Sequence, residues 1–405
     1  MKKIFFFGFT IIVLFTIVFI SCRKPPLPDR ISLDQSDVML ATNATLTLTA
    51  TTTRSTGANS HEIITGASLT WTSSNPSVAT VKDGVVSAKA DGITIITVTV
   101  DGRSYVTTSC TVFVTSKTIY IAGGDGTLWK NGIEQQLTDG SKDATINSIY
   151  VYGNDVYMAG EKGNVATVWK NGIAQNLTNG SSRAVASSVF VSGNDVYVAG
   201  SEETTQDMYV AKLWKNGVAQ NLSDGTYSAG ASSVFVSGND VYVAGGEDIT
   251  QDMYVAKLWK NGVAQNLSDG TYRAWASSVF VSGNDVYVAG NKYNAEGVFF
   301  ATLWKNGVAH NLTVYEWSFA YSVFVSGNDV YVGGSSLWKN GVEQNLTDIS
   351  YKEILFVTDK NVYVLDEREG HVITSWGLKP AHKLWVNGNV INLPMSFTPR
   401  AIFVK

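Results

Sequence analysis

The tetrapeptide Trp-Lys-Asn-Gly recurs along most of this 405-residue chain. Its copies begin at Trp129, Trp169, Trp214, Trp259, Trp304 and Trp338, and a variant, Trp-Val-Asn-Gly, begins at Trp385. Successive copies are 40, 45, 45, 45, 34 and 47 residues apart. Such a period is typical of architectures in which each repeat is one supersecondary unit packed against the next. The repeat therefore constrains the fold more than any other feature.

Each repeat carries four short strand signals. The clearest unit reads SVFVSGNDVYVAG from Ser188 and, after a variable stretch, AKLWKNGVAQNL from Ala211. Asn-Gly between two strands is the strongest short hairpin signal, because both central residues of a type I′ turn need positive φ. Uninterrupted apolar runs such as Val196–Ala199 indicate strands buried on both faces. Four antiparallel strands in about 45 residues predict one blade of a β-propeller.

The number of blades follows from the second strand of the unit. It occurs seven times, at Ile119, Val156, Val196, Val241, Val286, Val330 and Val362. The first strand precedes only six of these, whereas Arg400–Val404 has the first-strand pattern with no second strand after it. Closing a ring removes the exposed edges that open sheets must protect. We therefore predict that residues 116–405 form a seven-bladed β-propeller closed by the C-terminal strand.

A glycine pair ends some of the two-strand units, as at Gly123-Gly124, Gly245-Gly246 and Gly333-Gly334. With its strand-turn-strand pattern, the unit resembles the kelch repeat. Other units lack the pair, and the Tyr-Asp that follows the third strand in kelch repeats is absent. The resemblance thus supports the fold and implies no ligand.

The region from residue 31 to 115 has a different pattern. Thr45–Thr49 alternates polar and apolar residues, which predicts half-buried strands of an antiparallel sandwich. Leu69–Val100 contains a Trp in a strand, a Ser-Asn-Pro turn, an Asp-Gly hairpin and a Gly before the final strands. It resembles the bacterial immunoglobulin-like domain of group 2. That family implies a small β-sandwich of surface proteins, most often a rigid stalk and sometimes an adhesion module.

The N-terminus predicts export. Two lysines and the apolar run Ile4–Ile20 form a signal peptide over residues 1–21. Phe19-Ile20-Ser21-Cys22 resembles the lipobox of bacterial lipoproteins, although the family usually has Leu at the first of these positions and a small residue at the second. The resemblance implies lipidation of Cys22 and attachment at the outer membrane or cell surface. The alternative is an uncleaved anchor, because about 17 apolar residues are at the lower limit for spanning a bilayer.

Residues 22–30 contain three of the seven prolines, which predicts a stiff, extended tether. With Cys22 lipidated, Cys110 has no disulfide partner and is expected to be a small buried hydrophobe. The net charge is −4 and the 30 basic residues are scattered, so nucleic-acid binding has no electrostatic basis. The four histidines show no metal-ligand spacing. We expect no metal and no cofactor, and a monomer.

The connections from the second to the third strand, and from the fourth strand to the next blade, vary between repeats and share one face of a propeller. Binding residues concentrate on loops held by a rigid scaffold. Residues 201–245 and 246–290 differ at five positions, all in these connections. The pairs are Ser201 and Gly246, Glu203 and Asp248, Thr204 and Ile249, Ser228 and Arg273, and Gly230 and Trp275. Either relaxed loops or tuning toward a ligand explains this distribution.

The tryptophans locate the candidate site. Of 11, seven belong to the repeated hairpin, where we expect packing between blades, and Trp71 belongs to the immunoglobulin-like region. The remaining three lie in the variable connections with other aromatic residues. Aromatic rings stack on the apolar face of a sugar or anchor a protein contact; the alternative is that they cap the core. The candidate ligand-binding residues are Trp275, Trp317, Trp376, Tyr227, Tyr272, Arg273, Tyr315, Phe319 and Tyr351.

These features together predict a non-enzymatic, lipid-anchored envelope protein. The immunoglobulin-like domain is its stalk, and the variable propeller face binds a glycan or a protein. One alternative is a propeller enzyme acting on polysaccharide, which needs paired carboxylates. Its carboxylates would come from Glu202, Asp248, Glu316 or Asp366. The other alternative is a purely structural envelope protein.

Overall fold

The computed structural model describes residues 27–405, except 58–59, 125, 138–143, 205–207, 251–252, 314–316, 345–352, 359–360, 375–376 and 394–397. The predicted signal peptide, Cys22 and most of the tether lie outside these residues. The described part is all-β, with strands β1 to β38 and no helix. It accordingly holds no helix of the length and apolarity needed to cross a membrane.

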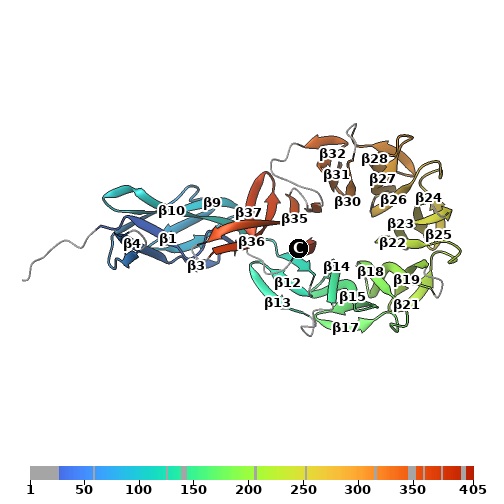
Figure 1. The fold of residues 1–405 in the computed structure, drawn as a ribbon, viewed down its shortest axis with the longest axis horizontal. Coiled ribbons are helices and arrows are strands. Elements are labelled where there is room, and N and C mark those ends of the chain that lie inside the picture. The colour runs from blue at the N-terminus through green and yellow to red at the C-terminus, as the bar shows by residue number, and fades with distance from the viewer. Residues whose placement is uncertain are drawn as a thin grey trace, which may run out of the picture.

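The first ten strands form a sandwich-like domain, at the left in Figure 1. Its sheets have the orders β1-β4-β5, β2-β10-β9-β6 and β3-β8-β7. The strands are β1 (Arg30–Leu33), β2 (Asp37–Ala41), β3 (Thr45–Thr47), β4 (Ala50–Gly57), β5 (Ser60–Ile63), β6 (Leu69–Ser73), β7 (Ala79–Lys82), β8 (Val85–Ala88), β9 (Gly92–Val100) and β10 (Arg103–Thr115). Cys110 is fully buried in this core, and burial raises the pKa of its thiol to about 12. The prediction of a small buried hydrophobe is confirmed.

The remaining strands form seven four-stranded antiparallel sheets in the described part, numbered 1 to 7 in the order of their repeated hairpins. Sheet 1 has β38 (Pro399–Val404), β11 (Ile119–Gly123), β12 (Thr127–Lys130) and β13 (Ile133–Gln136). Sheet 2 has β14 (Ala144–Tyr152), β15 (Asp155–Lys162), β16 (Val165–Lys170) and β17 (Ile173–Asn176); sheet 3 has β18 (Ala184–Ser192), β19 (Asp195–Glu203), β20 (Tyr209–Lys215) and β21 (Val218–Asn221). Sheet 4 has β22 (Ala229–Ser237), β23 (Asp240–Thr250), β24 (Met253–Lys260) and β25 (Val263–Asn266).

Sheet 5 has β26 (Ala274–Ser282), β27 (Asp285–Tyr293), β28 (Phe299–Lys305) and β29 (Val308–Asn311). Sheet 6 has β30 (Ala320–Ser326), β31 (Asp329–Gly334), β32 (Leu337–Lys339) and β33 (Val342–Gln344); sheet 7 has β34 (Glu353–Thr358), β35 (Asn361–Thr374), β36 (Gly377–Val386) and β37 (Asn389–Leu393). The sheets follow one another around a ring (Figure 1). The first-listed strand of each sheet contacts its counterpart in the next, and β38 contacts both β34 and β14. This arrangement is compatible with a propeller.

The C-terminal strand completes sheet 1. β38 pairs with β11 in antiparallel register, so that Ile119 is opposite Val404 and Ala122 is opposite Ala401. The two strands come from opposite ends of the ring-forming region. The predicted pairing of the last strand with the first repeat is therefore confirmed.

The tryptophans of the repeated hairpin pack between neighbouring sheets. Trp214 of sheet 3 has no exposed surface and shares a core with Tyr157 and Ala159 of sheet 2. Trp259 of sheet 4 shares a core with Tyr197 of sheet 3 in the same way. Packing between successive repeats, as predicted from the sequence, is confirmed.

The first-listed strand of each of the seven sheets is its inner strand, nearest the axis of the ring. In sheets 2 to 6 a β-bulge near the start of this strand explains a repeated glycine. In sheet 3 the register shifts between Ala186 and Ser188, which leaves Ser187 unpaired. A Cβ atom on Gly200, opposite this bulge, would lie 2.0 Å from the carbonyl oxygen of Val185. Equivalent contacts of 1.8–2.1 Å occur at Gly160, Gly245, Gly290 and Gly334. The bulge thus brings two backbones together more closely than any side chain permits.

We expect Gly200→Ala to destabilise the protein by about 1–3 kcal/mol, because the inner strand must shift to admit the methyl group. Gly124→Ala is the matched control, since a Cβ there meets no atom within 4 Å. Urea unfolding followed by circular dichroism measures both. Equal midpoints for the two variants would contradict this account of the bulge.

The first domain shares a core with the ring instead of being joined only by a linker. Met39 and Phe113 cluster with Tyr363 of sheet 7 and with Ile119 and Trp129 of sheet 1. In addition, Asn392 Nδ2 donates a hydrogen bond to Asp37 Oδ2 at 3.4 Å. The domain is therefore packed where the two ends of the ring meet.

Candidate binding face

The variable connections meet on one face between sheets 5 and 6. The backbone N–H of Trp317, which precedes β30, donates to the carbonyl oxygen of Phe299 at the start of β28. The Asn291 side chain is fully buried and donates through Nδ2 to the carbonyl oxygen of Ser318 at 2.9 Å. The Ser318 hydroxyl accepts the N–H of Ala301 at 3.0 Å. Between sheets 5 and 6, the connection from the second to the third strand of sheet 5 therefore lies beside the connection from its fourth strand to sheet 6, as the sequence predicts.

Six aromatic side chains converge there, and we call them the aromatic cluster: Trp275, Tyr293, Phe299, Trp317, Phe319 and Tyr321. Phe299 is central, with its ring centroid 4.8 Å from that of Trp317 and 4.2 Å from that of Phe319. Trp275 lies 5.9 Å from Tyr293 and 6.2 Å from Phe299. Phe319 and Tyr321 are stacked at 5.6 Å and 10°. The structure thus brings together three predicted residues, Trp275, Trp317 and Phe319.

Trp317 is the exposed member of the cluster. It is 56% exposed, and its ring stands on Phe299 at 87°. Its φ is +61°, whereas every other described non-glycine residue with positive φ is Asn or Asp. This conformation costs about 1–3 kcal/mol for a bulky residue, and such strain occurs most often at functional sites. The surrounding hydrogen bonds therefore hold an indole in solvent at an energetic cost.

The other predicted residues are dispersed. Tyr227 is 41% exposed between sheets 3 and 4, two sheet interfaces from the cluster. Tyr272 and the exposed Arg273 lie between sheets 4 and 5. Tyr315, Tyr351 and Trp376 lie outside the described residues.

Tyr272 lines a hollow of about 420 Å³ beside the cluster. Tyr293 belongs to both the hollow and the cluster. Lys292, Asn294, Glu296 and Asn311 also line the hollow, so amides and charged groups lie next to the aromatic rings. These four residues were not among the predicted ligand-binding residues, because that prediction was guided mainly by aromatic side chains.

The differences between sheets 4 and 5 are changes of packing. In sheet 4, a Cβ atom on Gly246 would lie 2.2 Å from Cε1 of Tyr254, whose ring therefore fills the space above this glycine. Burial raises the pKa of Tyr254 to about 12. One repeat later, Asn291 and Phe299 stand at the positions of Gly246 and Tyr254, and Trp275 stands at that of Gly230. These three differences between the two repeats together place the Trp275 side chain near the surface of sheet 5.

The carboxylates of the enzyme alternative are engaged or dispersed where they are described. Glu202 pairs with Lys212 at 2.8 Å on sheet 3. Burial raises the pKa of Asp248, which the positive charge of Arg273 partly opposes. Glu316 and the side chain of Asp366 lie outside the described residues. No group of three or more His, Cys, Asp or Glu suited to a metal ion occurs within the described part.

The opposite face carries the repeated turns. Asp195 accepts a hydrogen bond from Asn216 Nδ2 at 2.7 Å and pairs with Lys215 Nζ at 2.7 Å. These two groups lower the pKa of the Asp195 carboxyl. Asn216 has φ of +52° and also accepts the N–H of Val196 at 2.8 Å. This Asp is therefore a member of a hydrogen-bonded turn network, a usual place for Asp.

Comparison with known proteins identifies the first domain. Residues 29–112 match the family model of the bacterial Ig-like domain (group 2), which confirms the resemblance seen in the sequence. Domains of this family occur in bacterial surface proteins, which is consistent with an envelope location. No curated protein matches the chain.

Three solved structures that match the chain resemble it only distantly. The computationally designed Ika4 protein is 19% identical, with a TM-score of 0.25, over 42% of this chain and 98% of its own. A Mycobacterium tuberculosis puromycin-hydrolyzing peptidase is 11% identical, with a TM-score of 0.45, over 76% of this chain and 52% of its own. Pyrococcus horikoshii acylaminoacyl peptidase is 11% identical, with a TM-score of 0.41, over 75% of this chain and 51% of its own. The chain thus spans about half the length of either peptidase, and at these TM-scores the likenesses support no assignment.

Proposed function

We propose that this chain is a lipid-anchored, non-enzymatic envelope protein that binds a glycan through the aromatic cluster. Residues 116–405 would form a kelch-like, seven-bladed β-propeller closed by β38, with the immunoglobulin-like domain holding it away from the membrane. Seven successive four-stranded sheets and the pairing of β38 with β11 support the propeller. The lipobox-like sequence ending at Cys22 supports the anchor.

The exposed, strained Trp317 is the observation that carries the binding proposal. Burying its 56% exposed indole in the core would lower the free energy, yet the backbone holds it outward, with its ring nearly perpendicular to that of Phe299. The C–H groups on one face of a pyranose ring pack against such a π-face. In the adjoining hollow, Asn311 provides a side-chain amide for sugar hydroxyls. Asn294 provides its Nδ2 as a donor, since its Oδ1 already accepts the N–H groups of Glu296 and Val298. A flat, exposed ring beside amides is suited to a glycan.

We expect Trp317→Ala to weaken binding to the recognised polysaccharide at least tenfold, because it removes the exposed platform and leaves the buried rings in place. Glycan arrays identify the polysaccharide, and titration calorimetry measures the affinity. Tyr227→Ala is the control, since it removes an exposed aromatic residue two sheet interfaces away. Glycan binding unaffected by Trp317→Ala would refute the site, and binding only to an envelope protein would favour the protein-ligand alternative.

A further inference from the structure

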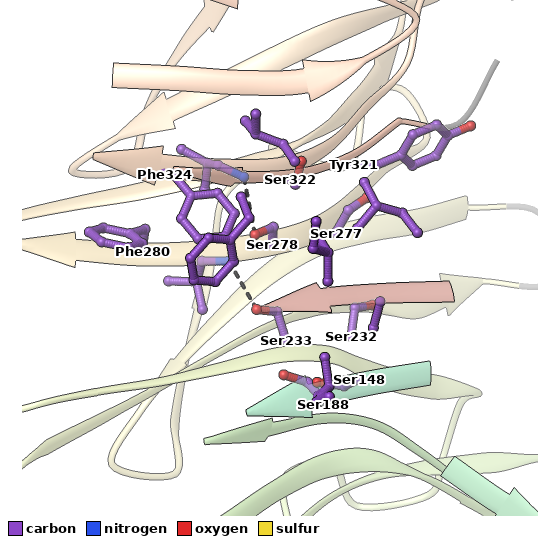
Figure 2. Close-up of a pocket in the computed structure, with 18 of the residues that line it drawn as sticks. Ser148, Ser188, Ser232, Ser233, Ser277, Ser278, Phe280, Tyr321, Ser322 and Phe324 are labelled. Carbon is purple, nitrogen blue, oxygen red and sulfur yellow. Dashed lines mark hydrogen bonds between the residues drawn. The ribbon is translucent and has the colours of Figure 1, made fainter. Parts of the chain in front are cut away.

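The ring encloses a cavity of about 500 Å³ on its axis, which Figure 2 shows in close-up. Residues from all seven inner strands, β14, β18, β22, β26, β30, β34 and β38, line it. Volumes of about 300–1,000 Å³ are typical of small-molecule sites. The cavity is thus large enough for one or two sugar units.

Serine hydroxyls form much of the cavity wall. Ser233 Oγ accepts the backbone N–H of Val279 from the next sheet at 3.2 Å, and Ser278 Oγ accepts that of Val323 at 3.2 Å (Figure 2). Ser148 and Ser188 make the equivalent bonds in sheets 2 and 3. In each case the hydroxyl oxygen accepts a hydrogen bond, so its own O–H remains available to donate.

The series of bonds ends at Ser322, whose buried Oγ has no hydrogen-bond partner among the described residues. In sheets 2 to 5 the partner of the serine is a backbone N–H of the next inner strand. The next strand after Ser322 is β34, which pairs with β35 without a bulge and has Ile354 at the serine position, and the corresponding bond is not formed. The cavity wall is therefore asymmetric, with an unsatisfied hydroxyl beside an apolar residue.

A closed circuit of aromatic rings borders one end of the cavity. Seven rings take part, one from each inner strand, and neighbouring centroids are 4.7–5.8 Å apart. Figure 2 places Phe280 and Phe324 on one side of the serines and Tyr321 on the other. The circuit is Tyr150, Phe190, Phe235, Phe280, Phe324, Phe356 and Phe403.

Tyr321 connects this cavity to the aromatic cluster. It lines the cavity and stacks on Phe319, which in turn contacts Phe299 beneath Trp317. The rings therefore lead from the exposed indole to the mouth of the cavity. A chain-like ligand on the cluster would have its end directed toward the axis.

We propose that the axial cavity is a second site, which binds the uncharged terminal unit of the glycan held at the aromatic cluster. Serine O–H groups donate to oxygens of that sugar unit, and its apolar face lies toward the aromatic circuit. Apart from Arg400, the described residues that line the cavity carry no charge, so most of this wall is suited to a neutral, hydroxyl-bearing unit. This inference rests on the proposed function.

The test fills the cavity without removing any bond in its wall. Ser277 lines the cavity at the bulge position of β26, where β30 has Tyr321, while its neighbour Ser278 keeps the bond between sheets. Ser277→Tyr therefore adds a ring that the fold already accommodates one sheet further on. Ser277→Ala is the size-matched control, and Ser232→Tyr, at the same position of β22, replaces the test variant if Ser277→Tyr does not fold.

The probes are neutral tetrasaccharides of the glucose, mannose, xylose and N-acetylglucosamine series, measured by titration calorimetry on the full ectodomain. We expect Ser277→Tyr to weaken binding at least tenfold and Ser277→Ala less than threefold. Loss of binding in Trp317→Ala with unchanged binding in Ser277→Tyr would overturn the cavity proposal and leave the proposed function intact. The reverse pattern would support the cavity and contradict the cluster. If the wild type binds none of the probes, both proposals fail for neutral glycans.

Discussion

Removal of residues 400–405 is expected to lower the melting temperature by about 10 °C or more, or to leave the protein insoluble. β38 is the inner strand of sheet 1, and its pairing with β11 joins the two ends of the ring. The deletion exposes the edge of β11, and such unpaired edges promote aggregation.

The size of this effect follows from burial. Ile402 is 5% exposed and Val404 is 3% exposed, and burying each such side chain contributes about 1.5–3 kcal/mol. Phe403 also links Tyr150 with Phe356 in the aromatic circuit. Since 1 kcal/mol corresponds to about 2–4 °C in a domain of this size class, the aliphatic pair alone predicts a shift near the stated value.

A rescue experiment distinguishes loss of the pairing between β38 and β11 from nonspecific destabilisation by the truncation. A synthetic peptide of residues 398–405 should raise the melting temperature of the truncated protein, and a peptide with the same residues in scrambled order should not. Extending the intact chain beyond Lys405 with six Gly and Ser residues should have little effect. Truncated protein with wild-type stability would show that the pairing with β11 is dispensable.

The second large effect is expected for Trp214→Ala, at about 3–5 kcal/mol of unfolding free energy. Trp214 is fully buried between sheets 2 and 3, so its removal leaves a cavity that both sheets line. Trp317→Ala should change stability by less than about 1 kcal/mol, because its indole is 56% exposed. Urea unfolding followed by far-ultraviolet circular dichroism measures both variants.

This comparison tests the division of the tryptophans into two kinds. Equal destabilisation by the two substitutions would show that Trp317 is also a packing residue, and would weaken the case for a binding platform. Trp259→Ala serves as a second buried variant, since Trp259 occupies the equivalent place between sheets 3 and 4. It should resemble Trp214→Ala.

The sheets were predictable because their signals are local. Asn216 and Gly217 have φ of +52° and +82°, the conformation that an Asn-Gly hairpin requires, and the same pair recurs in other repeats. The pairing of β38 was predictable by counting, since a first-strand pattern without a second strand needs a partner elsewhere. Neither inference depends on how side chains pack.

The binding face was only partly predictable. Trp317 and Trp275 stood out once the repeated tryptophans were set aside, but Phe299 and Tyr321 did not. Phe299 occupies the position of Tyr254, a core residue in sheet 4, and Tyr321 occupies the bulge position that holds serine in β26. A bulge redirects a side chain without changing the hydrophobic pattern, so its effect on this face was not readable from the sequence. The packing of Met39 and Phe113 on the ring was equally hidden, because both look like ordinary strand residues.

The parallel pairing of β2 with β10 has a mechanical consequence. In register, Asp37 faces Thr111 and Ala41 faces Thr115, so the strand near the chain's entry and the strand at its exit run in the same direction. Tension between the proposed N-terminal anchor and the proposed ligand on the ring would pull these strands past each other lengthwise. Hydrogen bonds loaded in shear must break together, whereas an unzipped pair breaks one bond at a time. A cell pulled by flow would thus strain the first domain along its more resistant direction.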